Sequence, residues 1–186
     1  MTWAFEFENQ PYFEGFRTLA TNGVDKPVLN VFRMFGMMGS ERIALRSNSS
    51  LEIDSILRSG VSGQADIGGI ATLEKGRLSA IVWNYHDQDV AVPAANVEMI
   101  ITGLPSAASQ PLVRHYRIDE ARSNAYTAWK GMGSPQQPTP EQYRQLLVQG
   151  RLQELAPEEK KRANQGELRI AFSLPRHAVS LLQVSW

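Results

Sequence analysis

The 186-residue sequence contains no cysteine, which excludes disulfide bonds, thiolate metal sites and a cysteine nucleophile. It also has no excess of either charge, because nineteen basic residues balance nineteen acidic ones. Binding to nucleic acid or to an anionic membrane would favour a basic surplus, so the composition predicts neither partner. No run of ~18 uninterrupted apolar residues occurs, and no transmembrane helix is predicted.

Histidine is scarce as well. His86, His115 and His177 lie far apart in the sequence, so we predict no His-rich metal site and no cofactor. The first eight residues lack the basic start and apolar run of a signal peptide, and the sequence leaves the cellular location open. The composition that remains, 42% hydrophobic and 20% charged, is typical of a globular chain. The length suits one domain, or one domain and a fragment of another.

The first forty residues predict a strand followed by a helix. Residues 1–8 alternate between Trp3, Phe5 or Phe7 and smaller or acidic residues, which indicates a β-strand. A helix is predicted over 27–38, and it is apolar on almost every side. One βα unit cannot bury both of its faces, so this segment is expected to belong to a larger α/β body. The alternative is that the helix packs on the chain that follows it.

From residue 40 the pattern changes to short strands separated by turns. A β-hairpin is predicted over 68–85, in which Gly76 takes a positive φ. The other predicted strands cover residues 43–45, 97–102, 112–118, 166–174 and 178–184. Short strands at this spacing predict an antiparallel β-sandwich.

An excursion between about residues 124 and 165 interrupts the strands. Thr139, Pro140 and Gln142 have the pattern of a helix N-terminus with a capping box, and this helix is expected to end near Gly150. The stretch 157–162 is strongly charged and is expected to be solvated.

Several long motifs resemble one known family. They read WAFEFE at 3–8, LATNGVDKPVLNVFRM at 19–34, HYRID at 115–119 with SNAY at 123–126, MGSPQ at 132–136, and LPRHAVSLL at 174–182. In these motifs the chain resembles the C-terminal portion of β-xylosidases of glycoside hydrolase family 39, and the resemblance extends from Trp3 to Trp186.

The resemblance implies a mainly β fold in two parts. Residues 1–39 resemble the last strand and helix of a (β/α)8 catalytic barrel. Residues 40–186 resemble the antiparallel β-sandwich accessory domain that comes after the barrel, here with a short helical insertion. On this interpretation the catalytic barrel is missing from the chain.

The resemblance also implies a reaction. Retaining glycosidases use two carboxyl groups about 5–5.5 Å apart, one as the nucleophile and one as the acid/base. In the family, an Asn-Glu-Pro motif after barrel strand four carries the acid/base, and the nucleophile ends strand seven. The chain contains no Asn-Glu-Pro and resembles only the portion of the family that lies beyond strand seven. We therefore expect no catalytic residue and no glycosidase activity in this chain alone. The full-length enzyme would remove terminal β-1,4-linked xylose from xylo-oligosaccharides.

Part of the sugar-binding wall is expected to remain. By their position on the last barrel strand, Trp3, Glu6 and Glu8 match the family's substrate-binding residues, and Glu14 in the loop after this strand is a further candidate. The alternative is structural, with Trp3 in the core of a strand and the two glutamates on its polar face.

Two other interpretations stay open. The turn at Asp87 and Asp89, beside His86, fits either a calcium site or a turn that is simply solvated, and we favour the solvated turn. The chain also fits a stand-alone carbohydrate-binding or protein-interaction module, which would carry a row of exposed aromatic residues. The candidates for that row are scattered: Trp83, Tyr85, Tyr116, Tyr126 and Trp129. Self-association into a homo-oligomer through the sandwich edges is left open.

Overall fold

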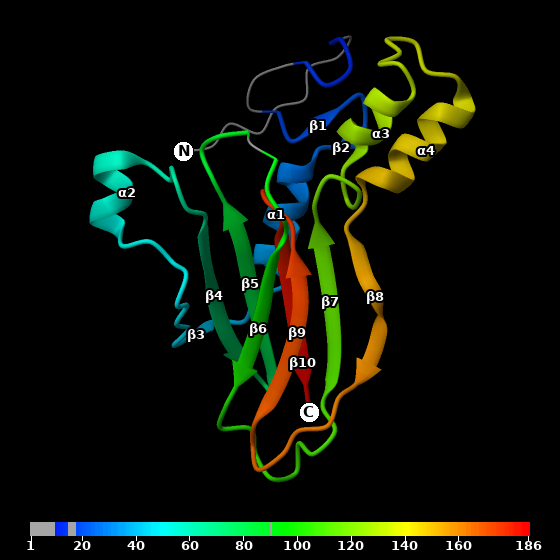
Figure 1. Ribbon diagram of the computed structural model, residues 1–186. Coiled ribbons are helices and arrows are strands. Elements are labelled where there is room, and N and C mark those ends of the chain that lie inside the picture. The colour runs from blue at the N-terminus through cyan, green and yellow to red at the C-terminus, as the bar shows by residue number, and fades with distance from the viewer. Residues whose placement is uncertain (1–9, 15–17, 90) are drawn as a thin grey trace. The chain divides into compact units, whose positions relative to one another are not determined.

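The computed structural model describes residues 10–14, 18–89 and 91–186 (Figure 1). The strand predicted over 1–8 lies outside the described residues. The chain forms two compact units: residues 1–36 with 117–153, and residues 37–116 with 154–186. The first unit therefore combines the N-terminal segment with the helical insertion, and the second contains most of the strands. The predicted domain boundary after residue 39 stays a prediction.

The first unit opens with a small hairpin that leads into a helix. Strands β1 (Ala20–Thr21) and β2 (Val24–Asp25) pair in antiparallel fashion across a turn in which Asn22 and Gly23 have φ values of 48° and 77°. Helix α1 (Pro27–Gly36) comes next, within the predicted range 27–38. Proline suits the first helical position because its missing N–H would have no intrahelical partner there.

Two short helices form the insertion, α3 (Ala125–Gly131) and α4 (Pro140–Gly150). The predicted capping box is confirmed: the Thr139 hydroxyl accepts from the Gln142 amide, and the Gln142 side chain accepts from the Thr139 amide. The helix ends at Gly150, as predicted. These helices and the hairpin enclose a small core of Val24, Ala125, Trp129 and Leu146.

The second unit is an antiparallel sandwich, as predicted. A six-stranded sheet has the order β3-β4-β5-β10-β7-β8, and β6 pairs with β9 in a separate two-stranded sheet (Figure 1). The strand bounds are β3 Glu41–Ile43, β4 Asp66–Glu74, β5 Arg77–Tyr85, β6 Ala95–Ile101, β7 Leu112–Ile118, β8 Gln153–Lys160, β9 Leu168–Leu174 and β10 Val179–Ser185.

The β4–β5 hairpin confirms the predicted turn. Glu74 pairs with Arg77, so Lys75 and Gly76 form a two-residue connection with φ values of 47° and 74°. Positive φ at both positions is the geometry that matches the twist of paired strands. Strand β10 lies beside β5, and its Leu181, Leu182 and Val184 are fully buried. This hairpin and β10 therefore form the centre of the larger sheet.

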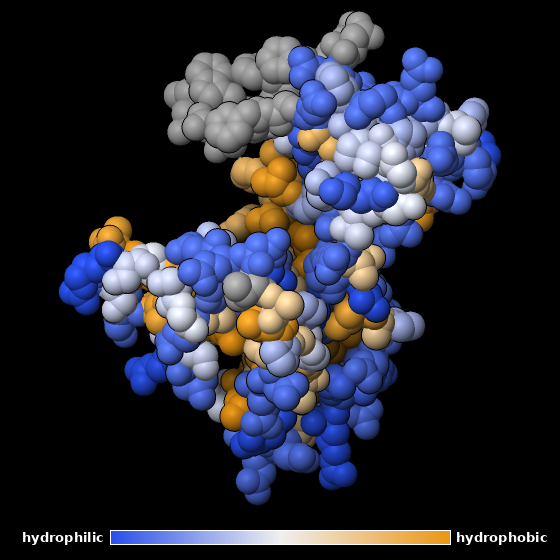
Figure 2. All heavy atoms as spheres, turned by 45° about the horizontal axis from the view of Figure 1, so that its top comes forward, coloured by the Kyte–Doolittle hydropathy of each residue, from blue (hydrophilic) through white to orange (hydrophobic). Residues whose placement is uncertain are grey.

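Two elements were not among the predicted strands and helices. Strand β8 overlaps the charged stretch 157–162; its side chains are mostly exposed, as expected of a solvated stretch, while its backbone extends the sheet edge. Helix α2 (Ile53–Ser59) was not predicted; Ile53 and Leu57 are exposed on it, and an orange hydrophobic cap shows there at the left of Figure 2. Strand β8 lacks the apolar alternation that reveals a strand in a sequence. Helix α2 does have apolar residues at helical spacing, Ile53, Ile56 and Leu57, but it is only seven residues long and buries none of them.

Among the described residues, no helix has both the length and the apolar character needed to span a membrane.

Candidate functional site

The loop 10–14 is the candidate functional site, because it directly follows the segment that contains Trp3, Glu6 and Glu8. Those three residues lie outside the described part of the chain, so their predicted contact with substrate stays a prediction. Glu14 is described: it is exposed, and its amide donates a 3.2 Å hydrogen bond to the Pro11 carbonyl, which closes a turn.

Long-range hydrogen bonds hold this loop in place. The Tyr12 amide donates to Oε1 of Gln136 at 2.8 Å, and the Phe13 amide donates to Oγ1 of Thr21 at 2.9 Å. In addition, Nδ2 of Asn22 donates to the Gln10 carbonyl at 2.9 Å. The loop is therefore fixed both to the small hairpin and to the segment after α3.

Three aromatic rings meet where the loop contacts α3. The Phe13 ring centroid lies 5.1 Å from that of Trp129 and 5.5 Å from that of Tyr126. Trp129 and Tyr126 are 5.8 Å apart. Such tilted and edge-on arrangements are favourable for aromatic pairs. The Trp129 Nε1 donates to the Pro135 carbonyl at 2.9 Å, which satisfies the one polar atom of this buried ring.

The structure brings together two of the motifs that carried the family resemblance. Residues 123–126 start α3, and residues 132–136 form the tight turn after it. Gly133 and Ser134 have φ values of 84° and 57°, and the Ser134 amide donates to the Trp129 carbonyl at 3.0 Å. This turn positions Gln136 against Tyr12, so both motifs support the candidate loop.

Partial burial shifts the pKa values of two side chains at the loop. Burial lowers the pKa of Lys26, whose ammonium donates to the Glu14 carbonyl at 3.2 Å and also to the Thr18 hydroxyl. Burial, and to a lesser degree the nearby Tyr143, raises the pKa of Tyr12. Lys26 is therefore a positively charged donor that holds the loop backbone.

A buried polar joint connects α1 with the helical insertion. Asn30 has no exposed surface; its Nδ2 donates to the carbonyls of Gly150 at 2.6 Å and Ser123 at 3.2 Å, and its Oδ1 accepts from Arg33 at 2.9 Å. Ser123, with a φ of 54°, donates in turn to the Arg117 carbonyl at 2.7 Å. The helical scaffold behind the loop is thus fixed by satisfied, buried hydrogen bonds.

The sandwich unit offers weaker candidates. Asp87 accepts from the Val61 amide at 2.5 Å, and Asp89 pairs with Arg176, so both carboxylates of the predicted turn already have partners. No group of three or more His, Cys, Asp or Glu side chains within the described residues could hold a metal ion. His115 contacts Ser180 at 2.9 Å and packs edge-on against Phe172, which is a structural role.

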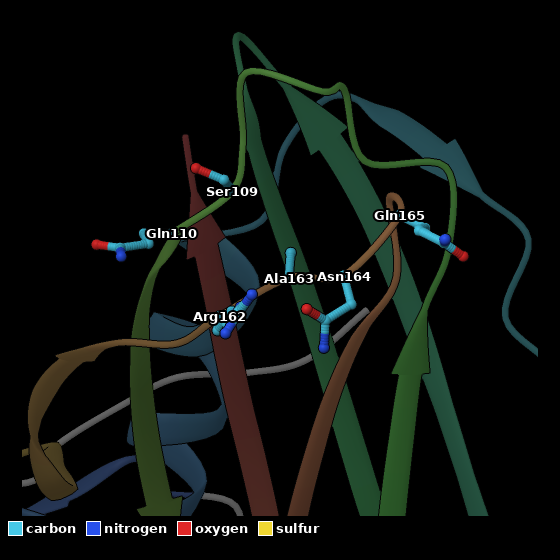
Figure 3. Close-up of a pocket in the computed structure, with 6 residues that line it drawn as sticks. All are labelled: Ser109, Gln110, Arg162, Ala163, Asn164 and Gln165. Atoms are coloured by element: carbon cyan, nitrogen blue, oxygen red, sulfur yellow. The ribbon is translucent and has the colours of Figure 1, made fainter.

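Two of the hollows among the described residues lie in this unit. One of about 580 Å³ is lined by polar loop residues, and in Figure 3 Gln110 and Gln165 point to opposite sides of it. These two amide groups therefore do not converge on one position, as the polar groups of a ligand pocket do. The other, of about 870 Å³, is lined largely by apolar residues of the sandwich interior, such as Ala71, Ala80 and Met99.

Comparison with known proteins identifies the family. The sequence pattern of glycosyl hydrolases family 39 matches residues 4–164. A β-xylosidase of Geobacillus stearothermophilus is 23% identical over 170 residues, which cover 91% of this chain and 29% of that protein. The fold and the sequence thus define a portion of a glycoside hydrolase, and this chain belongs to glycosyl hydrolases family 39.

Solved structures share the fold. The family 39 enzyme of Xanthomonas axonopodis pv. citri matches with a TM-score of 0.73 and 20% identity, over 94% of this chain and 33% of that one. A monomeric β-xylosidase of Caulobacter crescentus CB15 matches with a TM-score of 0.70 and 18% identity, over 94% of this chain and 34% of that one. The chain spans about a third of the length of these relatives.

Sequence reasoning missed two residues of the site. In the sequence, Gln136 stands out only as the last residue of the motif at 132–136. Tyr126 stands out only as the last residue of the motif at 123–126 and as one of several scattered aromatic residues. Their sequence separation from Phe13 exceeds one hundred residues, and no local periodicity records a contact of that range.

Proposed function

We propose that this chain is the C-terminal part of a retaining β-xylosidase that removes terminal β-1,4-linked xylose from xylo-oligosaccharides. The family membership supports a glycoside hydrolase, and two relatives that are β-xylosidases support xylose as the sugar. In this proposal residues 1–39 are the last strand and helix of the catalytic barrel, and residues 40–186 are the accessory sandwich with its helical insertion.

The exposed apolar face of α1 is the observation that carries this proposal. Val28, Phe32 and Phe35 are spaced at i, i+4 and i+7, and they are 43%, 47% and 48% exposed. Residues at this spacing share one helix face. A contiguous apolar stripe on a helix normally packs against another element, and a barrel would supply it.

The chain's contribution to the reaction is binding rather than proton transfer. Trp3, Glu6 and Glu8 would line the subsite for the terminal xylose, at the end of the barrel where strands carry active-site residues. An aromatic ring can stack on the C–H face of a sugar, and carboxylates accept hydrogen bonds from its hydroxyl groups. The fastened loop 10–14 would hold that wall in place. The nucleophile and the acid/base would come from the barrel strands that this chain lacks.

The proposal is tested by comparing two proteins on 4-nitrophenyl β-xyloside. One is the 186-residue chain, and the other is the protein encoded when the reading frame is extended upstream through an Asn-Glu-Pro motif. We expect turnover, with retention of the anomeric configuration by NMR, only for the longer protein. In the longer protein, Trp3→Ala should raise KM, whereas Trp186→Ala should not. Robust turnover by the 186-residue chain, or an upstream frame without a barrel, would overturn the proposal.

A further inference from the structure

The exposed ring of Tyr126 stands on a rigid aromatic base. Tyr126 is 44% exposed, whereas the adjacent Trp129 is only 8% exposed and Phe13 is half-buried. Packing against both rings restricts the tyrosine before any ligand arrives. A ring ordered in this way loses little conformational freedom on binding, which favours affinity.

Polar groups that suit hydroxyl ligands occur on α3 and on the segments that contact the loop 10–14. Lys130, one helical turn along α3, places its Nζ over the Tyr126 ring, 5.6 Å from the ring centroid. The exposed Gln136 keeps its amide nitrogen available as a donor, since only its Oε1 bonds to Tyr12 among the described residues. The exposed Glu14 adds a carboxylate acceptor in the adjoining loop.

This mixture differs from the apolar stripe on α1. The exposed stripe of Val28, Phe32 and Phe35 on α1 is apolar, as expected for a surface that packs on protein. Helix α3 instead combines the Tyr126 ring with the cation of Lys130. Gln136 after the helix and Glu14 in the loop 10–14 add an amide and a carboxylate, and the two formal charges cancel. A neutral pyranose chain has matching chemistry, with apolar C–H faces and a rim of hydroxyl groups. A strongly anionic ligand would require more than one cation.

We propose that Tyr126, with Lys130 beside it and Gln136 in the turn after α3, is a carbohydrate-binding platform for a neutral, β-linked sugar chain. The inference rests on the proposed function for its choice of xylo-oligosaccharide as the ligand. The platform adjoins the loop after Trp3, Glu6 and Glu8, so it would contact sugar units beyond the terminal one. Tyr126 is therefore a residue for chain-length preference and not a catalytic residue.

The test is an NMR titration of the uniformly ¹⁵N-labelled 186-residue chain with xylotriose. We expect saturable shifts at residues 12–14 and 126–136. Tyr126→Ala should weaken binding about tenfold, which corresponds to a loss of ~1.4 kcal/mol. Tyr126→Phe keeps the ring and should bind almost as well. Tyr85→Ala is the matched control, because Tyr85 is exposed to a similar extent, 47%, in the sandwich unit.

Each outcome decides the proposal. Absence of saturable shifts, or equal weakening by Tyr126→Ala and Tyr85→Ala, overturns the platform. A Tyr126-dependent response to cellotriose but not to xylotriose supports the platform and contradicts xylose as the sugar in the proposed function. If the longer protein hydrolyses the xyloside while Tyr126→Ala leaves the titration unchanged, the platform fails and the proposed function stands. Circular dichroism is the check that each variant is folded, which we expect because both tyrosines are exposed.

Discussion

The amide nitrogen of Tyr12 and the Oε1 atom of Gln136 lie 2.8 Å apart, although 124 positions separate the two residues in the chain. This hydrogen bond connects the segment after the predicted sugar-binding strand to the turn after α3. Because the bond is exposed, its net contribution to stability should be small. Its main effect is to order the loop 10–14.

Gln136→Ala should therefore loosen the loop more than it destabilises the protein. The variant leaves the Tyr12 N–H to water, so we expect a free energy of unfolding lower by about 0.5–1 kcal/mol. Hydrogen exchange at the Tyr12 amide should become clearly faster. The matched control is Gln137→Ala, because the neighbouring Gln137 is also exposed. Equal exchange rates at Tyr12 in both variants would contradict a fastening role for Gln136.

The buried joint at Asn30 should be much more sensitive. Asn30→Leu fills a similar volume but leaves the carbonyls of Gly150 and Ser123 without their donor. Burying unsatisfied polar groups costs about 1–3 kcal/mol, so we expect a loss of that size in denaturant unfolding. Asn96→Ala, at an exposed strand position, is the control and should change stability by less than about 0.5 kcal/mol. A neutral Asn30→Leu would mean that the joint does not hold the insertion on α1.

Two helix-terminal glycines predict opposite signs for the same substitution. At Gly150 a Cβ atom would lie 2.9 Å from the Asp25 carbonyl oxygen, so Gly150→Ala should destabilise the chain despite the better helix propensity of alanine. At Gly131 no atom lies within 4 Å of the position that the alanine methyl group would take, and φ is not positive. Gly131→Ala should stabilise by up to about 0.5–1 kcal/mol. Thermal unfolding of the two variants checks the sign: stabilisation by Gly150→Ala would contradict the close contact there, and destabilisation by Gly131→Ala would contradict the open space at Gly131.

Local features of the fold could be predicted from the sequence because adjacent residues encode them. The Thr139–Gln142 capping box and the turn at Gly76 each depend on residue types within four positions. Strand β8 could not be predicted in this way. It is an edge strand with mostly exposed, charged side chains, and only its backbone pairing marks it as a strand.

In the candidate site, too, local features could be predicted from the sequence and long-range contacts could not. The sequence indicated the segment from Trp3 to Glu14 through family resemblance, but it offered no reason to connect that segment with Tyr126 or Gln136. Those contacts depend on how α3 and the turn after it pack, which is a property of tertiary structure. The motif at 132–136 becomes intelligible only when Gly133 and Ser134 are seen to turn the chain toward Tyr12.

The raised pKa of Tyr12 predicts a specific loss of stability in alkali. Burial and the nearby Tyr143 raise this pKa above its ordinary value of 10.0 in the folded chain. Well below that value Tyr12 is protonated in both the folded and the unfolded chain, so its ionisation takes nothing from the free energy of unfolding. As the pH rises, the unfolded chain ionises first, which favours unfolding until the folded Tyr12 also ionises.

Tyr12→Phe removes this ionisation, so the variant should retain more of its stability than the unchanged chain as the pH rises through 10.0, the ordinary pKa of a tyrosine. Lys26 acts in the opposite direction, because burial lowers its pKa below 10.5 and its desolvation cost is relieved as the pH rises. That effect is common to both proteins and cancels in the difference. Urea unfolding at pH values from below to above 10.0 measures the effect, and near pH 8 it gives the pH-independent cost of losing the hydroxyl. Parallel stability curves for the two proteins would show that Tyr12 ionises as easily in the folded chain as in the unfolded one.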